Sequence, residues 1–198
     1  MNIRKATITD INSIVEIHCD AFDGFFLASL GVSFLKFYYK CFIRSDETVT
    51  MVAEEDDKIC GFSASTKFCK GFNSRLIKNN LFAFGMFALK LLVTSPKSLI
   101  RLVNNLTKKS DSVKDDEEYA ELYSIGVSKS AQGKGIGKRL LTYSEKIMKE
   151  NGVNRISLTT DFYNNESAIR FYHSVGYETF YEFVTYPNRK MYRLIKIL

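Results

Sequence analysis

The stretch YAELYSIGVSKSAQGKGIGKRLL, residues 119–141, carries the clearest structural signal in the chain. Its first part has the two-residue period of a β-strand, which predicts one strand face formed by Glu121, Tyr123, Ile125 and Val127. A turn with alternating glycines follows, and the pattern then becomes helical. Backbone N–H groups gather at such a turn, at the positive end of the next helix. The turn therefore predicts a site for phosphate oxygens.

Two common phosphate-binding loops do not fit this turn. The dinucleotide fingerprint needs a further glycine where the chain has Lys138 and Leu140. The nucleoside-triphosphate loop needs four residues between its glycines, followed by Gly-Lys-Ser/Thr, and that spacing is missing. What remains is the pattern Q-x-x-G-x-G, which starts at Gln132 directly after a hydrophobic strand.

Composition is that of an ordinary globular protein. The 198 residues are 45% hydrophobic and 25% charged, a length that predicts a single domain over 1–198. The net charge of +6 is compatible with an anionic ligand, and it does not require nucleic-acid binding.

Cysteine and histidine usage argues against a metal centre. The four cysteines form no C-x-x-C pair, and the two histidines belong to no cluster with metal-ligand spacing, so no metal site is predicted. The first ten residues lack the apolar region of a signal peptide. We therefore expect a reduced, cytoplasmic protein.

Strand-like and helical periods alternate along the rest of the chain. This order predicts a mixed α/β sheet with helices on its faces. The expected elements are a strand at 2–6, helices at about 10–21 and 26–43 (the second interrupted near Gly31), a hairpin of 48–54 and 59–67, a helix after the glycine turn to about 151, a strand at 153–160, a helix at 165–175, and a hairpin over 177–197.

Residues 70–118 form a helical insertion of different character. We expect helices at 75–93 and 97–106, followed by a charged loop from 108 to 118. The apolar run is too short to span a bilayer. Three interpretations remain open: packing on the sheet, a homodimer contact, or an acceptor lid with lipid or membrane affinity. The last would use apolar residues that lie beside basic ones, namely Arg75, Lys78, Lys97 and Arg101.

A second segment makes the interpretation of the glycine turn more specific. Residues 165–177, NESAIRFYHSVGY, are similar to the pattern N-x-x-A-x-x-x-Y-x-x-x-G-[FY]. With the preceding Q-x-x-G-x-G turn, and one helix and one strand between them, the segment resembles the GCN5-related N-acetyltransferase (GNAT) family. The resemblance implies the acyl-CoA N-acyltransferase fold, with a mostly antiparallel central sheet and helices on both faces, and acetyl-CoA as the acyl donor.

The resemblance also implies roles for individual residues. Backbone N–H groups of the turn would bind pyrophosphate, with Lys134 and Lys138 adding positive charge. The preceding strand would pair with pantetheine, and a bulge at Gly126 would direct an amide at the thioester carbonyl. The implied donor-binding residues are Ile125, Gly126, Val127, Gln132, Gly133, Lys134, Gly135, Ile136, Gly137 and Lys138.

Three further residues are candidates for the chemistry itself. Tyr172 matches the tyrosine that protonates the leaving thiolate, although a packing role is the alternative. Asn165 either bonds the donor or only caps a helix. Glu121 is the candidate general base, because its position on the predicted face of the thioester-binding strand, six residues before Val127, is similar to that of the base glutamate in the histone-type branch of the family. The alternatives are that Glu121 is an ordinary paired carboxylate, and that the base is a water relayed from Tyr123 or a hydroxyl.

These features predict direct transfer of an acetyl group to a primary amine of a small molecule or protein, because no Cys or Ser has the histidine–acid partners of a covalent nucleophile. The competing hypotheses are a non-catalytic CoA-binding regulatory domain and a transferase of longer acyl groups. The identity of the amine is not encoded in any motif, and the 70–118 insertion is the expected source of acceptor choice.

Overall fold

The computed structural model describes residues 1–22, 24–107 and 115–198. Its described strands form one seven-stranded sheet in the order β1-β2-β3-β4-β5-β7-β6. The β4–β5 pair is parallel and the other pairs are antiparallel, which confirms the mixed, mostly antiparallel sheet. The strands are Asn2–Lys5 (β1), Thr48–Glu55 (β2), Lys58–Thr66 (β3), Ala120–Val127 (β4), Arg155–Asp161 (β5), Glu178–Thr185 (β6) and Arg189–Ile197 (β7).

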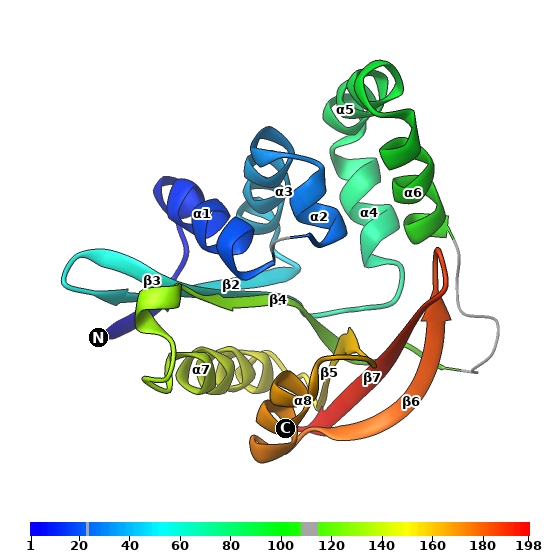
Figure 1. Ribbon diagram of the computed structural model, residues 1–198. Helices are drawn as coiled ribbons and strands as arrows, with labels where there is room; N and C mark the ends of the chain where they lie inside the picture. Colours follow the sequence, from blue (N-terminus) through cyan, green and yellow to red (C-terminus); the bar gives the residue numbers. More distant parts are fainter. Residues whose placement is uncertain (23, 108–114) are drawn as a thin grey trace.

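Helices cover both faces of this sheet. Figure 1 shows α1, α2 and α3 on one face and α7 and α8 on the other, and one hydrophobic cluster fills each interface. Gly31, with φ +90°, separates α2 from α3 at the break that the sequence predicts. The helices are Ile11–Ala21 (α1), Phe26–Ser29 (α2), Val32–Arg44 (α3), Phe72–Asn79 (α4), Leu81–Thr94 (α5), Pro96–Thr107 (α6), Ile136–Glu150 (α7) and Glu166–Ser174 (α8).

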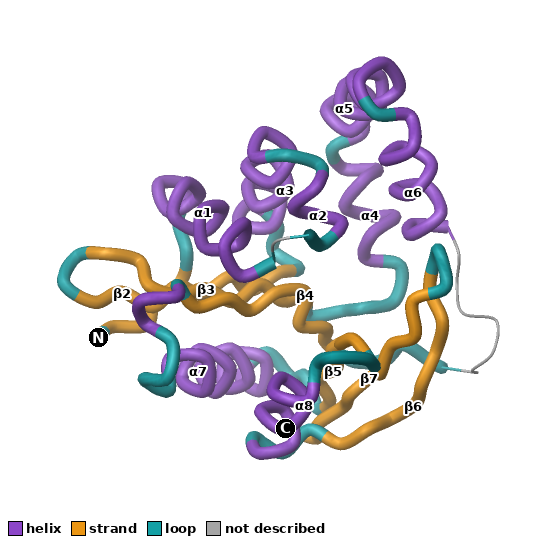
Figure 2. The backbone as a smooth tube through the Cα atoms, in the orientation of Figure 1, coloured by secondary structure: helices purple, strands orange, loops and turns teal. Residues whose placement is uncertain are grey.

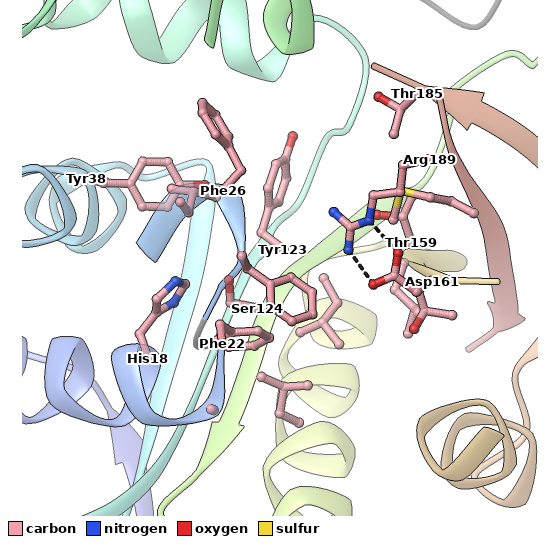
Figure 3. A pocket seen from close by; sticks show the side chains of 18 of the residues that line it. His18, Phe22, Phe26, Tyr38, Tyr123, Ser124, Thr159, Asp161, Thr185 and Arg189 are labelled. Carbon is pink, nitrogen blue, oxygen red and sulfur yellow. Dashed lines mark hydrogen bonds and ion pairs between the residues drawn. The ribbon is translucent and has the colours of Figure 1, made fainter. Parts of the chain in front are cut away.

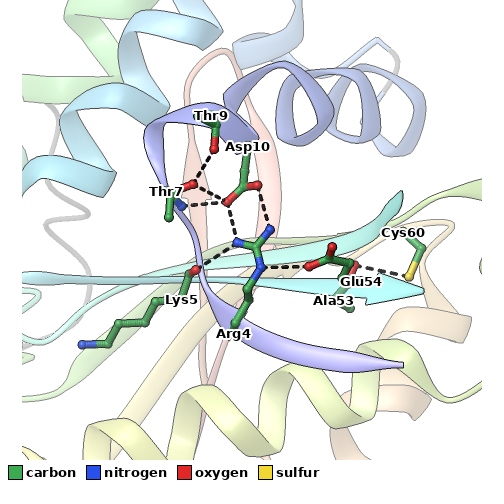
Figure 4. A network of polar contacts seen from close by, with 8 residues as sticks. All are labelled: Arg4, Lys5, Thr7, Thr9, Asp10, Ala53, Glu54 and Cys60. Atoms are coloured by element: carbon green, nitrogen blue, oxygen red, sulfur yellow. Dashed lines mark hydrogen bonds and ion pairs between the residues drawn. The ribbon is translucent and has the colours of Figure 1, made fainter. Parts of the chain in front are cut away.

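A network around Arg4 fixes the start of α1 to the edge of the sheet (Figure 4). The Arg4 guanidinium donates to the Asp10 carboxylate at 2.8 and 3.0 Å and to Glu54 at 2.8 Å. Hydrogen bonds from Arg4 are the main reason why the pKa of Asp10 lies below its usual value. The network joins β1, β2 and the turn before α1, and thereby positions the helix that forms one wall of the cleft described below.

A β-bulge at Tyr123 interrupts the alternation of β4. Ala64 pairs with Ser124 but Ser65 pairs with Leu122, so Tyr123 is the extra residue. As a result, Tyr123 packs in the cluster on the α3 side, whereas Ile125 packs in the cluster on the α7 side. The prediction of one face shared by Glu121, Tyr123, Ile125 and Val127 is therefore wrong, because a bulge reverses the faces beyond it.

Gly126 is not the bulge residue, contrary to the expectation from the resemblance. It pairs regularly with Phe62 of β3. A Cβ atom at this position would lie 2.9 Å from the Phe62 ring and 3.3 Å from Ile17 of α1. Glycine is needed at residue 126 because the strand packs closely beneath α1.

The insertion forms three helices, α4, α5 and α6, with residues 108–114 of the predicted loop lying outside the described residues. The predicted single helix over 75–93 is wrong, since α4 and α5 meet at Asn80 with a bend of 92°. No single helix in the described ranges is long and apolar enough to cross a membrane, and only the bent α4–α5 pair passes that test. Figure 2 shows α5 and α6 reaching beyond the layer formed by α1–α3.

Candidate active site

A cleft of about 560 Å³ opens where β4 and β5 separate. The two strands pair in parallel from Ala120 to Leu122, and in the described residues their ladder ends at Leu122 and Leu158. Beyond that point Ser124 and Ile125 of β4 line one side of the cleft and Thr159 to Asp161 of β5 line the other. The divergence leaves one backbone edge of β4 without a strand partner, so its N–H and C=O groups are available to an extended ligand.

The glycine turn continues from the end of β4 to the N-terminus of α7. Gly133 and Gly135 have φ values of +79° and +74°, which side chains other than glycine rarely adopt. Gln132 to Gly135 are exposed, and the Gln132 amide donates to the Val127 carbonyl at 3.3 Å. The first turn of α7 has N–H groups without intrahelical acceptors, which makes the turn suitable for an anion.

The charges at the rim of this turn are partly engaged within the protein. Lys134 lies 3.2 Å from the Glu55 carboxylate at the β2–β3 hairpin. Both side chains are largely exposed, so this ion pair contributes little to stability and can exchange for a phosphate. Lys138 is exposed in the first turn of α7.

Tyr172 of α8 lines the cleft opposite β4. Its ring packs near Phe171 and Tyr177, with centroids 5.2 and 5.9 Å away. Burial raises the pKa of the Tyr172 phenol to about 12, so the hydroxyl is protonated at neutral pH. A protonated hydroxyl in the lining of the cleft has the chemistry of a proton donor.

Glu121 of β4 is held in a buried ion pair. Arg193 of β7 donates to Oε1 at 2.6 Å, and the Cys69 thiol donates to Oε2 at 3.0 Å. Burial alone would lower the pKa of Arg193, but the charge of Glu121 raises it on balance. Both carboxylate oxygens therefore have partners inside the protein.

The charge of Glu121 nevertheless acts on two tyrosines of the cleft. Tyr38 and Tyr123 both line the cleft. Burial, followed by the negative charge of Glu121, raises the pKa of Tyr123 well above 10, and the same charge contributes to the raised pKa of Tyr38. The Glu121 carboxylate thus acts electrostatically on Tyr123 at the cleft, and its role as a base stays a prediction.

Asn165, the predicted start of α8, also lines the cleft. It occupies the N-cap position, but its amide donates to the Thr160 hydroxyl at 2.6 Å and to the Asp161 carbonyl at 3.2 Å rather than acting as a cap acceptor. These bonds fasten α8 to the end of β5. They orient Asn165 at the cleft wall, while its predicted contact with the donor stays a prediction.

The side of the cleft formed by β5 and β7 contains an ion pair that the sequence did not predict. Arg189, at the start of β7, forms two hydrogen bonds with the Asp161 carboxylate at the end of β5 (Figure 3). The guanidinium carbon also lies 5.1 Å from the centre of the Phe25 ring. Asp161 could have been suspected from its position at the end of a strand, but no pattern in the sequence links it to Arg189.

The remaining wall of the cleft is mostly apolar. It is formed by α1, α2, α3 and the first two helices of the insertion, with Phe84 of α5 contributing directly. His18 lies in this wall, with Nδ1 2.7 Å from the Tyr39 hydroxyl and a pKa lowered to about 4 by burial. A neutral histidine paired to tyrosine in a hydrophobic cluster has a packing role. The apolar lining residues are Phe22, Phe25, Phe26, Leu27, Leu30, Phe34, Leu76, Ile77 and Phe84.

Among the residues that the structure describes, no group of three His, Cys, Asp or Glu side chains gathers as metal ligands would. The four cysteines are free thiols; Cys41 and Cys60 are buried, and Cys19 and Cys69 are half-buried.

Comparison with solved structures places this architecture among acetyltransferases. The ribosomal-protein-alanine N-acetyltransferase of Brucella melitensis superposes with a TM-score of 0.64 at 17% identity, with 100% of both chains covered. An aminoglycoside 6'-acetyltransferase type Ii gives 0.63 at 15% identity, covering 100% of this chain and 97% of that one. The PaiA N-acetyltransferase of Thermoplasma acidophilum, in complex with coenzyme A, gives 0.55 at 15% identity, covering 100% and 98%.

At these identities the structural likeness establishes the fold, and sequence comparison establishes the family. No curated protein sequence matches the chain closely enough to count as a relative. The sequence model of the acetyltransferase (GNAT) family, however, matches residues 11–177, which include α1, the glycine turn and Tyr172. The chain belongs to the GNAT acetyltransferase family.

Proposed function

We propose that the protein transfers an acetyl group from acetyl-CoA directly to a primary amine. The observation that carries the proposal is the unpaired edge of β4, which runs from the cleft beside Tyr172 to the glycine turn at α7. An extended chain with amides at one end and phosphates at the other matches this series of groups. Coenzyme A has that composition.

The donor would be held almost entirely by backbone groups. N–H groups of Gly133 to Lys138 would bind the pyrophosphate, with Lys134 released from Glu55 and Lys138 at the rim. The edge of β4 from Ile125 to Val127 would pair with the pantetheine amides, and Asn165 would support it from α8. Free thiols at all four cysteines are consistent with a reducing, cytoplasmic location.

In the proposed reaction the amine nitrogen bonds to the thioester carbonyl carbon, and the carbon–sulfur bond breaks. A backbone N–H of the β4 edge would stabilise the oxyanion. The amine must lose one proton; Tyr123 would accept it while passing its own proton to Glu121. The leaving thiolate must gain one proton, which Tyr172 would supply.

The cleft also limits the class of acceptor. Its acceptor wall is rich in aromatic and aliphatic side chains, while Asp161 and Arg189 provide a polar pair at the rim. This combination suits an amine attached to an apolar or aromatic body better than a highly charged polyamine. A longer acyl donor is the second candidate, because the same apolar wall could accommodate an extended acyl chain.

The proposal is tested by measuring thiol release from acetyl-CoA with a panel of amines, in parallel with longer acyl-CoA donors. We expect amine-dependent thiol release that is highest with acetyl-CoA and with amines bearing apolar groups. Faster turnover with a longer acyl donor would favour the second candidate. Saturable CoA binding with no acyl transfer to any amine would instead identify a regulatory domain.

A further inference from the structure

Helix α5 has a covered side and an uncovered side. On the covered side Phe84 and Phe87 pack against Phe37 of α3, with ring centroids 5.0 and 5.1 Å apart. These contacts fix the helix to the body of the protein. The position of α5 is therefore determined by packing, although the helix extends beyond α1–α3 (Figure 1).

The uncovered side carries a continuous apolar stripe. Phe82, Met86, Leu89 and Val93 follow one another at spacings of four, three and four residues, which places them on one helix face. Their exposed fractions are 85%, 55%, 60% and 84%. We call these four residues the outer stripe of α5.

The outer stripe forms part of an apolar groove, with Phe82, Met86 and Leu89 in its lining. The groove encloses about 500 Å³ between α5 and Leu99 of α6, and apolar side chains of α5 form most of its lining. Four large, almost uncovered apolar residues at such a groove are more than scattered surface hydrophobics, and they mark a surface that meets an apolar partner.

The charge around the outer stripe has a single sign. Residues 70–107 contain six of the 28 Lys and Arg residues of the chain and none of its 22 Asp and Glu residues, so the other 160 residues contain 22 of each sign. The net charge of residues 70–107 thus equals the +6 of the whole chain. Lys78, Lys90 and Lys97 are exposed, and Lys90 is the next residue in sequence after Leu89 of the outer stripe.

Asp115 and Asp116, which follow this segment in sequence, contact the body of the protein. Asp115 accepts hydrogen bonds from Tyr119 and Tyr181, and Asp116 lies 3.0 Å from Arg155. These two carboxylates therefore have partners outside residues 70–107.

We propose that the outer stripe of α5, with Lys78, Lys90 and Lys97 around it, docks onto a membrane surface that contains anionic lipids. Aliphatic and aromatic side chains enter the boundary between headgroups and acyl chains, while lysines at the edge bind lipid phosphates. The outer face of α5 meets the membrane, while Phe84 on its inner face lines the cleft, so docking brings the acceptor side of the cleft close to the membrane.

A second copy of the chain fits this surface less well. A two-fold dimer through the outer stripe would bring the same basic residues of both copies together. The insertion has no carboxylate in residues 70–107 to neutralise them, so like charges would oppose each other across the interface. An anionic membrane neutralises the same lysines.

Flotation with lipid vesicles tests the proposal without reference to catalysis. The wild-type protein should float with vesicles of phosphatidylglycerol mixed into phosphatidylcholine at low salt, and much less with phosphatidylcholine alone or at high salt. Phe82→Ser with Val93→Ser should reduce vesicle partitioning by about tenfold or more, and Lys90→Glu with Lys97→Glu should do the same. All four side chains are exposed, so these variants should retain the fold and CoA binding.

Matched substitutions on other surfaces provide the controls. Ile197→Ser removes an apolar side chain that is 81% exposed on β7, and Lys149→Glu reverses an exposed charge on α7. Both should float like the wild type. The proposal is overturned if wild-type protein does not bind anionic vesicles, or if the four insertion substitutions leave partitioning unchanged. It is also overturned if Phe82→Ser with Val93→Ser dissociates a dimer of a protein that binds no vesicles.

Discussion

At the scale of single residues, the account depends first on Tyr172. We expect Tyr172→Phe to lower kcat by about 100-fold with little change in the KM for acetyl-CoA, since only the proton for the leaving thiolate is lost. Steady-state kinetics with the best amine measures this. Tyr177→Phe is the matched control, because Tyr177 is a buried neighbour with its ring 5.9 Å from that of Tyr172, and it should retain kcat. A Tyr172→Phe enzyme with wild-type turnover would remove the acid assignment.

Glu121 has two roles in this account. It forms a structural ion pair with Arg193, and it is the proposed final acceptor of the amine proton. Glu121→Gln leaves the largely buried Arg193 without its carboxylate, so the free energy of unfolding should fall by about 3 kcal/mol in urea titrations. The double variant Glu121→Gln with Arg193→Met should recover part of that stability. If Glu121 accepts the amine proton, kcat stays low in the double variant. Recovery of kcat together with stability would show that the carboxylate acts only through the ion pair.

His18 gives the fold a defined pH dependence. Its pKa is about 4 in the folded protein, compared with 6.5 for a solvated histidine. Between these values the unfolded chain binds a proton that the folded protein does not, so stability is complete above pH 6.5 and falls as the pH drops toward 4. The loss attributable to His18 is about 3 kcal/mol.

Urea titrations from pH 7 to 4.5 measure this dependence. His18→Gln should flatten the decline, because glutamine does not titrate. His173→Gln should leave the decline intact, since His173 is exposed on α8. An unchanged slope in His18→Gln would mean that other groups cause the acid sensitivity.

At the scale of elements, two positions of the glycine turn allow the requirement for a special backbone conformation to be distinguished from the requirement for space. Gly135 has φ +74°, and a Cβ atom added there would have nothing within 4 Å. At Gly137, by contrast, a Cβ atom would make an ordinary contact at 3.6 Å with Phe171, and φ is not positive. Gly135→Ala should therefore cost about 1 kcal/mol of stability and weaken CoA binding, because the N–H groups of the turn shift.

Gly137→Ala is the internal comparison for this prediction. Residue 137 lies in the first turn of α7, so alanine should be neutral or stabilising by about 0.5 kcal/mol. Thermal unfolding and calorimetric CoA titration of both variants provide the test. Equal effects of the two substitutions would contradict a conformational requirement at Gly135.

Strand β4 shows which structural features could be predicted from the sequence and which could not. Its existence, its glycine turn and the helix after it were predictable, because strand period, glycine spacing and helix period are local properties of the chain. The bulge at Tyr123 was not, since it depends on how β3 pairs with β4 across a separation of about sixty residues. One inserted residue then moved Glu121 and Ile125 to opposite faces, so the predicted geometry of the base failed while the predicted strand held.

At the scale of the whole molecule, element order was predictable and long-range pairing was not. Two sequence motifs separated by one helix and one strand were enough to infer the sheet and its covering helices. The pairing of Asp161 with Arg189, and of Glu121 with Arg193, joins residues that lie 28 and 72 positions apart and that no local pattern relates. The bend between α4 and α5 was equally hidden, because no proline or glycine marks the junction at Asn80.

The central claim is that the unpaired edge of β4 and the glycine turn together bind an acyl-CoA. A calorimetric titration of the purified protein with acetyl-CoA tests it most directly. The account predicts saturable binding of one acetyl-CoA per chain, with a dissociation constant in the range of about 1 µM to 1 mM that is typical of enzyme substrates, and weaker binding by Gly135→Ala. The absence of saturable binding by the wild-type protein, or wild-type affinity in Gly135→Ala, would contradict it.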